Sequence, residues 1–182
     1  KILEDEYNAV KEIITTQIRL SPYDETKKLR LVIDRASSIG VGFVLFQYHS
    51  DQNPAKGAVI INANSSLLGE NQVGYSPIDA ELLGLDFASR ACHYWLWCSP
   101  QIELYCSGML DMLNKPITDI QNHRHQKILT RLMTYNFEGH HIPGDDNKIA
   151  DALSRLCRNV VSTHHYSQTM PRILPTSKRA SI

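Results

Sequence analysis

The sequence lacks four features that would identify whole classes of protein. Its 182 residues contain no apolar run near the ~20 residues of a membrane-spanning helix, and the start, Lys1-Ile2-Leu3-Glu4-Asp5-Glu6, is not a signal peptide. The four cysteines form no C-x-x-C pair, which favours reduced, buried thiols over disulfides or zinc ligands. Nineteen basic and nineteen acidic residues give zero net charge, so composition carries no global sign of a nucleic-acid binder. We therefore expect an intracellular protein, in the cytoplasm or nucleus, with no membrane partner.

The residue types that are present suit one globular domain with flanking segments. An apolar content of 42% with 21% charged residues is ordinary for a globular protein, and 182 residues are too few for two full-sized domains. The expected organisation is an N-terminal helix and connection at 1–22, a domain at 23–157 and a linker or disordered tail at 158–182. Because a helical pattern is already under way at residue 1, we expect a fragment of a longer polyprotein.

Hydrophobic periodicity predicts an α/β fold. Apolar residues alternate in some segments and recur at helical spacing in others. The predicted strands cover residues 29–34, 41–48, 56–63, 102–106 and 136–142, and the predicted helices cover 77–96, 108–113, 122–135 and a last segment that carries Asp151. The first three strands are close enough in sequence to be antiparallel neighbours. This order predicts a mixed five-stranded sheet with helices on its faces.

Three acidic residues stand where such a sheet could bring them to one edge. Asp34 ends the first predicted strand, Glu81 lies near the start of the long helix, and Asp151 lies in the first turns of the last helix. Hydrolysis of a phosphodiester by two magnesium ions needs several carboxylates from separate elements, because Mg²⁺ prefers hard oxygen ligands. Each acid also has an ordinary explanation, as a strand-end residue or as part of a solvated helix face. From the residues alone, the ordinary explanation of each acid is favoured.

Several motifs, in the same order along the chain, resemble the ribonuclease H domain of reverse transcriptases from gypsy-like LTR retrotransposons. Residues 141–155 are similar to "H-x-P-G-x-x-N-x-I-A-D-A-L-S-R", residues 31–45 to "T-D-A-S-x-x-G-I-G-A-V-L", and residues 92–96 to "C-H-Y-Y-L". The resemblance implies a ribonuclease H-like fold that cleaves the RNA strand of an RNA/DNA hybrid with Mg²⁺, or Mn²⁺, as cofactor. It also implies that the rest of the reverse transcriptase polyprotein is a partner of this domain.

The resemblance assigns Asp34, Glu81 and Asp151 as catalytic residues and metal ligands. Asp34 would bridge the two metal ions, and the other two carboxylates would be further ligands. In this match Ile33 replaces the family's threonine, and Arg35 is interpreted as a one-residue insertion.

The match departs from the family after the fourth predicted strand. Where the family has "T-D-H-x-x-L", this chain has residues 106–111, CSGMLD, so that Ser107 stands in place of an aspartate. A neutral hydroxyl is a weak magnesium ligand and removes a full negative charge, and Asp111 lies too far along the helix to replace it. The hypothesis is a ribonuclease whose activity is impaired or lost. The alternative is a catalytically inactive module with the same fold that is kept for nucleic-acid binding or subunit packing. Under this alternative, a host genome could also have taken over the module for another use.

A basic cluster on the helix predicted after Asn122 is the best candidate for contact with nucleic acid. Arg124, Lys127 and Arg131 belong to it. If they bind, the partner is the phosphate backbone of an RNA/DNA hybrid, and the contact depends on shape and salt rather than on base sequence. An exposed helix face with no partner explains the same residues equally well.

Overall fold

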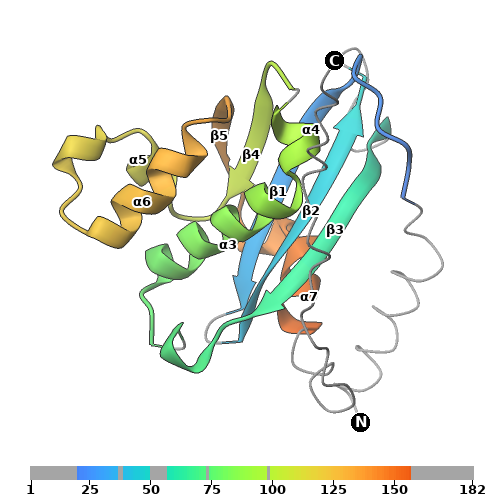
Figure 1. Cartoon of the computed structure of the whole chain (residues 1–182). Helices are drawn as coiled ribbons and strands as arrows, with labels where there is room; N and C mark the ends of the chain where they lie inside the picture. The colour runs from blue at the N-terminus through green and yellow to red at the C-terminus, as the bar shows by residue number, and fades with distance from the viewer. Residues whose placement is uncertain (1–19, 37–38, 50–56, 73, 98, 157–182) are drawn as a thin grey trace, which may run out of the picture.

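A computed structural model describes residues 20–36, 39–49, 57–72, 74–97 and 99–156 (Figure 1). The N-terminal helix expected within 1–19 and the tail expected at 158–182 lie outside these residues, as do Cys98 and Cys157. Cys92 and Cys106 are buried free thiols, as the cysteine spacing predicts. No helix in the part of the chain that is described is long and apolar enough to cross a membrane.

The predicted mixed five-stranded sheet is confirmed. Its strands are β1 (Lys28–Ala36), β2 (Gly40–Tyr48), β3 (Val59–Leu67), β4 (Ile102–Cys106) and β5 (Phe137–His141). They lie in the order β3-β2-β1-β4-β5, with β1, β2 and β3 antiparallel and with β4 parallel to both β1 and β5. The change from hairpins to parallel pairing occurs at β1, so the helices between β3 and β5 must cross over the sheet.

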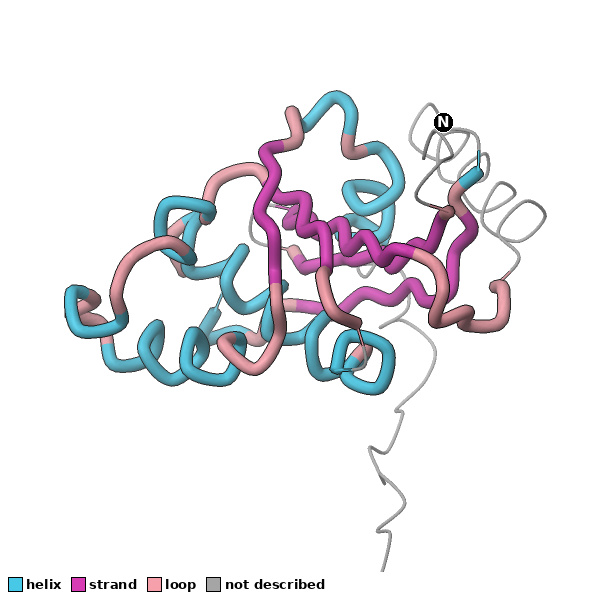
Figure 2. The backbone as a smooth tube through the Cα atoms, turned by 90° about the horizontal axis from the view of Figure 1, so that it is seen from above, coloured by secondary structure: helices cyan, strands magenta, loops and turns pink. Residues whose placement is uncertain are grey.

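Helices lie on both sides of this sheet (Figure 2). They are α3 (Pro77–Ala91), α4 (His93–Trp97), α5 (Leu110–Leu113), α6 (His123–Leu132) and α7 (Lys148–Leu156), with 3₁₀ turns η1 (Glu70–Gln72), η2 (Ile117–Asp119) and η3 (Gly144–Asp146). In Figure 1, α3 lies in front of β1 and β2 and packs against α6, whereas α7 lies behind the strands, against β1, β2 and β3. The sheet is therefore the middle of three layers.

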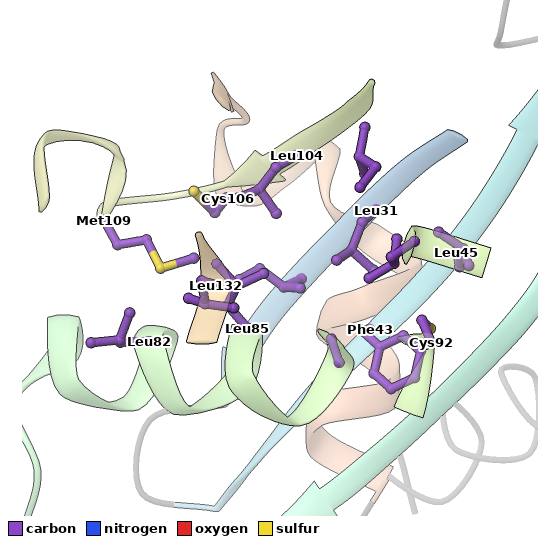
Figure 3. Close-up of a cluster of buried hydrophobic side chains, with 14 of the residues drawn as sticks. Leu31, Phe43, Leu45, Leu82, Leu85, Cys92, Leu104, Cys106, Met109 and Leu132 are labelled. Atoms are coloured by element: carbon purple, nitrogen blue, oxygen red, sulfur yellow. The ribbon is translucent and has the colours of Figure 1, made fainter. Parts of the chain in front are cut away.

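The main core fills the space between the sheet and α3. Leu31, Phe43 and Leu45 project from β1 and β2, and they meet Leu82 and Leu85 of α3 (Figure 3). All five side chains are 0% exposed, so burial of this apolar surface is the main force that fixes α3 on the sheet. The odd-numbered apolar residues of β1 thus point to α3. Because side chains alternate along a strand, the even-numbered residues of β1 point to the opposite face of the sheet.

Two predicted boundaries differ most from the structure. The helix predicted at 77–96 ends at Ala91, because the chain turns at Cys92, where φ is −105° and ψ is 10°, before α4 begins. β3 continues through residues 64–67, which were expected in a loop. Residues 64–66 are polar, and all four pair with β2 in an edge strand. Asparagine and serine do not favour strands as β-branched residues do, so this pairing had no sign in the sequence.

Candidate functional site

Glu81 is buried where α3 passes the ends of β1 and β4. The residue is 6% exposed. The Ser107 hydroxyl donates a hydrogen bond to Glu81 Oε1, and the Gly108 backbone N–H donates one to Oε2 over 2.9 Å. Arg35 Nε lies 3.8 Å from Oε1. The structure thus brings the predicted residues Glu81 and Ser107 together, and it adds a guanidinium that the sequence interpretation had left out of the site.

Arg35 reaches Glu81 because it points to the α3 face of the sheet. The pairing of Lys28–Ala36 with β2 has no bulge, so Arg35 is a regular strand residue opposite Val41. A Cβ built on Gly84 of α3 would lie 3.3 Å from Val41 Cγ1, which shows that this position faces α3. Arg35 Nε is buried and has no hydrogen-bond partner among the described residues. The strand therefore has no bulge at Arg35, the residue that was interpreted as an insertion.

Asp34 points to the opposite face, against α7. Gly42 is its direct partner on β2, and a Cβ there would lie 2.6 Å from the backbone nitrogen of Ser154 in α7. Ser154 Oγ donates a hydrogen bond to Asp34 Oδ2 over 3.3 Å. Burial and, second, the negative charge of Asp151 raise the pKa of Asp34 to about 6. Asp151 itself forms an ion pair with Arg155, whose Nε lies 2.7 Å from Asp151 Oδ1.

The three predicted metal ligands therefore fall into two groups. Asp34 and Asp151 lie together on the α7 face, whereas Glu81 lies with Ser107 on the α3 face. Within the described ranges, no group of three or more His, Cys, Asp or Glu side chains is placed to hold a metal ion. The residues present do not fit a pair of magnesium ions at Glu81, because the site has one carboxylate and a guanidinium beside it.

The raised pKa of Asp34 predicts that folding stability falls as pH rises. The carboxyl titrates at about 6 in the folded state, against an ordinary value of 3.8, so the folded state binds this proton more tightly than the unfolded chain. The contribution of Asp34 is therefore fully present below about pH 4 and is lost as pH rises through about 6. We expect Asp34→Asn to raise the free energy of unfolding at pH 7 by ~1–2 kcal/mol, after allowance for partial exposure. Urea melts near pH 4.5 and pH 7 test this, and a variant less stable than the wild type at pH 7 would contradict it.

The three basic residues predicted to contact nucleic acid differ in whether an acidic side chain pairs with them. Arg124 Nη2 lies 3.0 Å from Asp79 Oδ1, and its guanidinium lies 4.0 Å from the Tyr75 ring centroid. Arg131 Nε donates to Asp86 Oδ1 over 2.9 Å. Both arginines thus form ion pairs with acids of α3, although Asp86 also pairs with Arg90 of the same helix.

Lys127, the third of these residues, is exposed and forms no ion pair within the described part of the chain. Of the three basic residues predicted on α6, only Lys127 is thus without an ion pair among the described residues. Contact of this surface with nucleic acid stays a prediction.

Comparison with known proteins gives consistent matches. Residues 3–104, more than half of the chain, match the family described as the RNase H-like domain found in reverse transcriptase. The Transposon Tf2-3 polyprotein of Schizosaccharomyces pombe is 27% identical over 149 residues, which cover 81% of this chain and 11% of that polyprotein. The chain thus spans about a tenth of the length of such relatives.

Solved structures show the same fold. A Prototype Foamy Virus protease-reverse transcriptase has a TM-score of 0.51 at 15% identity, over 74% of this chain and 18% of the other. A foamy viral protease-reverse transcriptase in complex with dsDNA has a TM-score of 0.50 at 14% identity, over 73% of this chain and 28% of the other. The predicted ribonuclease H-like fold is therefore confirmed.

Proposed function

Because the chain belongs to the family of ribonuclease H-like domains found in reverse transcriptase, we propose that it is a duplex-holding domain that no longer cleaves RNA. It would belong to the reverse transcriptase of a gypsy-like LTR retrotransposon and bind an RNA/DNA hybrid within the larger polyprotein. We expect it to act in the cytoplasm or nucleus. The match to a transposon polyprotein and the fold shared with a protein solved on dsDNA support this proposal.

The proposal that the domain no longer cleaves RNA rests on one observation, the surroundings of Glu81. Two-metal hydrolysis needs convergent carboxylates that bind Mg²⁺ or Mn²⁺ and together offset the charge of the ions. Both oxygens of Glu81 instead accept hydrogen bonds, from Ser107 and Gly108, and a guanidinium nitrogen of Arg35 lies 3.8 Å away. The competing function, hydrolysis through Asp34, Glu81 and Asp151, draws support from the closeness of the two aspartates, but it needs Glu81 on the same face.

We expect the wild-type chain to bind a labelled RNA/DNA hybrid without cutting it. Cleavage in Mg²⁺ and in Mn²⁺ should stay at the level of a protein-free control, because the carboxylates that would hold two ions do not converge. Gel shifts should give an affinity that falls steeply with salt, as expected for phosphate contacts. Rapid cutting by the wild type would overturn the loss of cleavage, and the absence of any binding would overturn the proposed function as a whole.

The exposed lysine of α6 provides a sharper test of binding. If Lys127 contacts a phosphate, Lys127→Gln should weaken hybrid binding several-fold and reduce the slope of log affinity against log salt by about 1. Lys28→Gln is the matched control, because Lys28 is exposed on β1 and belongs to a different element. Equal effects of the two substitutions would mean that α6 is not the contact surface.

A further inference from the structure

We infer that Arg35 occupies the position of the first metal-binding aspartate, so that a built-in guanidinium takes the place of a divalent cation beside Glu81. This inference deepens the proposed function and rests on it, because it takes the site to descend from a metal-dependent one. It replaces the assignment of that position to Asp34. Three independent observations carry it.

The first observation is the face of β1 that each residue occupies. Leu29, Leu31 and Ile33 all belong to the core under α3, and Arg35 is the next residue in this alternating row. Its guanidinium lies beside the Glu81 carboxylate. A side chain that binds the same metal ion as Glu81 would have to lie at this point. Asp34 is excluded from this point, since adjacent residues of a strand project from opposite faces.

The second observation is that the sequence fits without a gap when Arg35 takes that place. If Asp34 stands at the threonine of "T-D-A-S-x-x-G-I-G-A-V-L", then Arg35 stands at the aspartate. Every later position follows in register, with identities at Ala36, Ser37, Gly40, Gly42, Val44 and Leu45. The unbroken pairing of β1 with β2 agrees with this register, because no bulge marks Arg35 as an extra residue within the strand.

The third observation is the charge balance at the site. Arg35 carries a guanidinium, and among the described residues the carboxylate with which it forms an ion pair is Glu81. The pair sums to zero, and Ser107 adds a neutral donor rather than a third ligand. An incoming Mg²⁺ or Mn²⁺ would meet a cation a few ångströms away and no net negative charge to offset it. The charges of the side chains at this site thus disfavour the binding of a divalent cation.

Metal-dependent melting tests this inference without any measurement of cleavage. Wild-type protein should show no rise in melting temperature with Mn²⁺, and Ser107→Asp alone should show none either, because Arg35 remains. Arg35→Asp combined with Ser107→Asp should create a site, so that Mn²⁺ at tenfold its Kd raises the melting temperature by ~4 °C. Isothermal titration with MnCl₂ should give binding in the double variant alone.

The two assignments of the first ligand are separated by adding Asp34→Asn to the double variant. If Arg35 occupies that position, the response to Mn²⁺ persists; if Asp34 does, the response disappears and the inference is overturned. Binding of Mn²⁺ by the wild type or by Ser107→Asp would overturn it as well, and these two proteins remain informative if the double variant does not fold. Hybrid binding by the wild type is a separate readout, so failure of the proposed function and failure of this inference are distinguishable.

Discussion

Gly42→Ala is expected to lower the free energy of unfolding by about 3 kcal/mol, because the added methyl group would meet backbone rather than a movable side chain. A Cβ at Gly42 would lie 2.6 Å from the nitrogen of Ser154 and 2.8 Å from the carbonyl oxygen of Ala150. Both atoms belong to α7, which packs directly on β2 at this point. The helix can relieve the clash only by moving away from the sheet as a unit.

Movement of α7 should also disturb the contacts that tie the helix to β1. Asn147 Nδ2 donates a hydrogen bond to the Ile33 carbonyl oxygen over 3.0 Å, and Ser154 donates one to Asp34. We therefore expect Gly42→Ala to increase hydrogen exchange across α7 before it affects the core under α3. Urea melts and amide exchange measure the two effects.

Gly74→Ala is the control for this substitution. A Cβ at Gly74 has no heavy atom within 4 Å, so this substitution should change the free energy of unfolding by less than ~1 kcal/mol. If the two glycine variants were equally stable, the close approach of α7 to β2 would not contribute to folding, and the placement of Asp151 beside Asp34 would lose its structural basis.

The fold could be predicted from the sequence because its strands under α3 carry a clear alternating pattern. Ile102–Cys106 was predicted residue for residue, since Ile102, Leu104 and Cys106 are buried while the residues between them are partly exposed. The polar end of β3 was missed for the opposite reason. Its side chains lie on an edge strand, where the backbone pairing with β2 leaves no hydrophobic signal.

The site could be predicted only in part, and the physical reason is the two-residue period of a strand. Keeping Asp34 as the ligand required one inserted residue, and a shift of one residue moves a side chain to the other face of the sheet. The buried row Leu29, Leu31 and Ile33 already indicated that Arg35, not Asp34, faces the long helix. Which charges converge is decided by packing between distant elements, so the ion pairs that Arg124 and Arg131 form with α3 had no signal in the sequence.

Glu81→Ala is expected to destabilise the domain by ~2–4 kcal/mol, because it removes a buried carboxylate that is the counter-charge of one group and the hydrogen-bond acceptor of two others. Glu81 has a side chain only 7% exposed, and it accepts from the Ser107 hydroxyl and from the Gly108 N–H. Arg35, whose Nε already lacks a hydrogen-bond partner among the described residues, would keep its positive charge without a carboxylate beside it. Glu70→Ala, at an exposed acid of η1, is the control and should have almost no effect.

A double-mutant cycle separates the ion pair from the other contacts of Glu81. If Arg35 and Glu81 form the pair at this site, Arg35→Met should be tolerated better in the Glu81→Ala background than in the wild type, with a coupling of at least ~1 kcal/mol in urea melts. Additive effects would mean that the guanidinium and the carboxylate do not interact. Measurable coupling would mean that this pair contributes to folding stability without any metal.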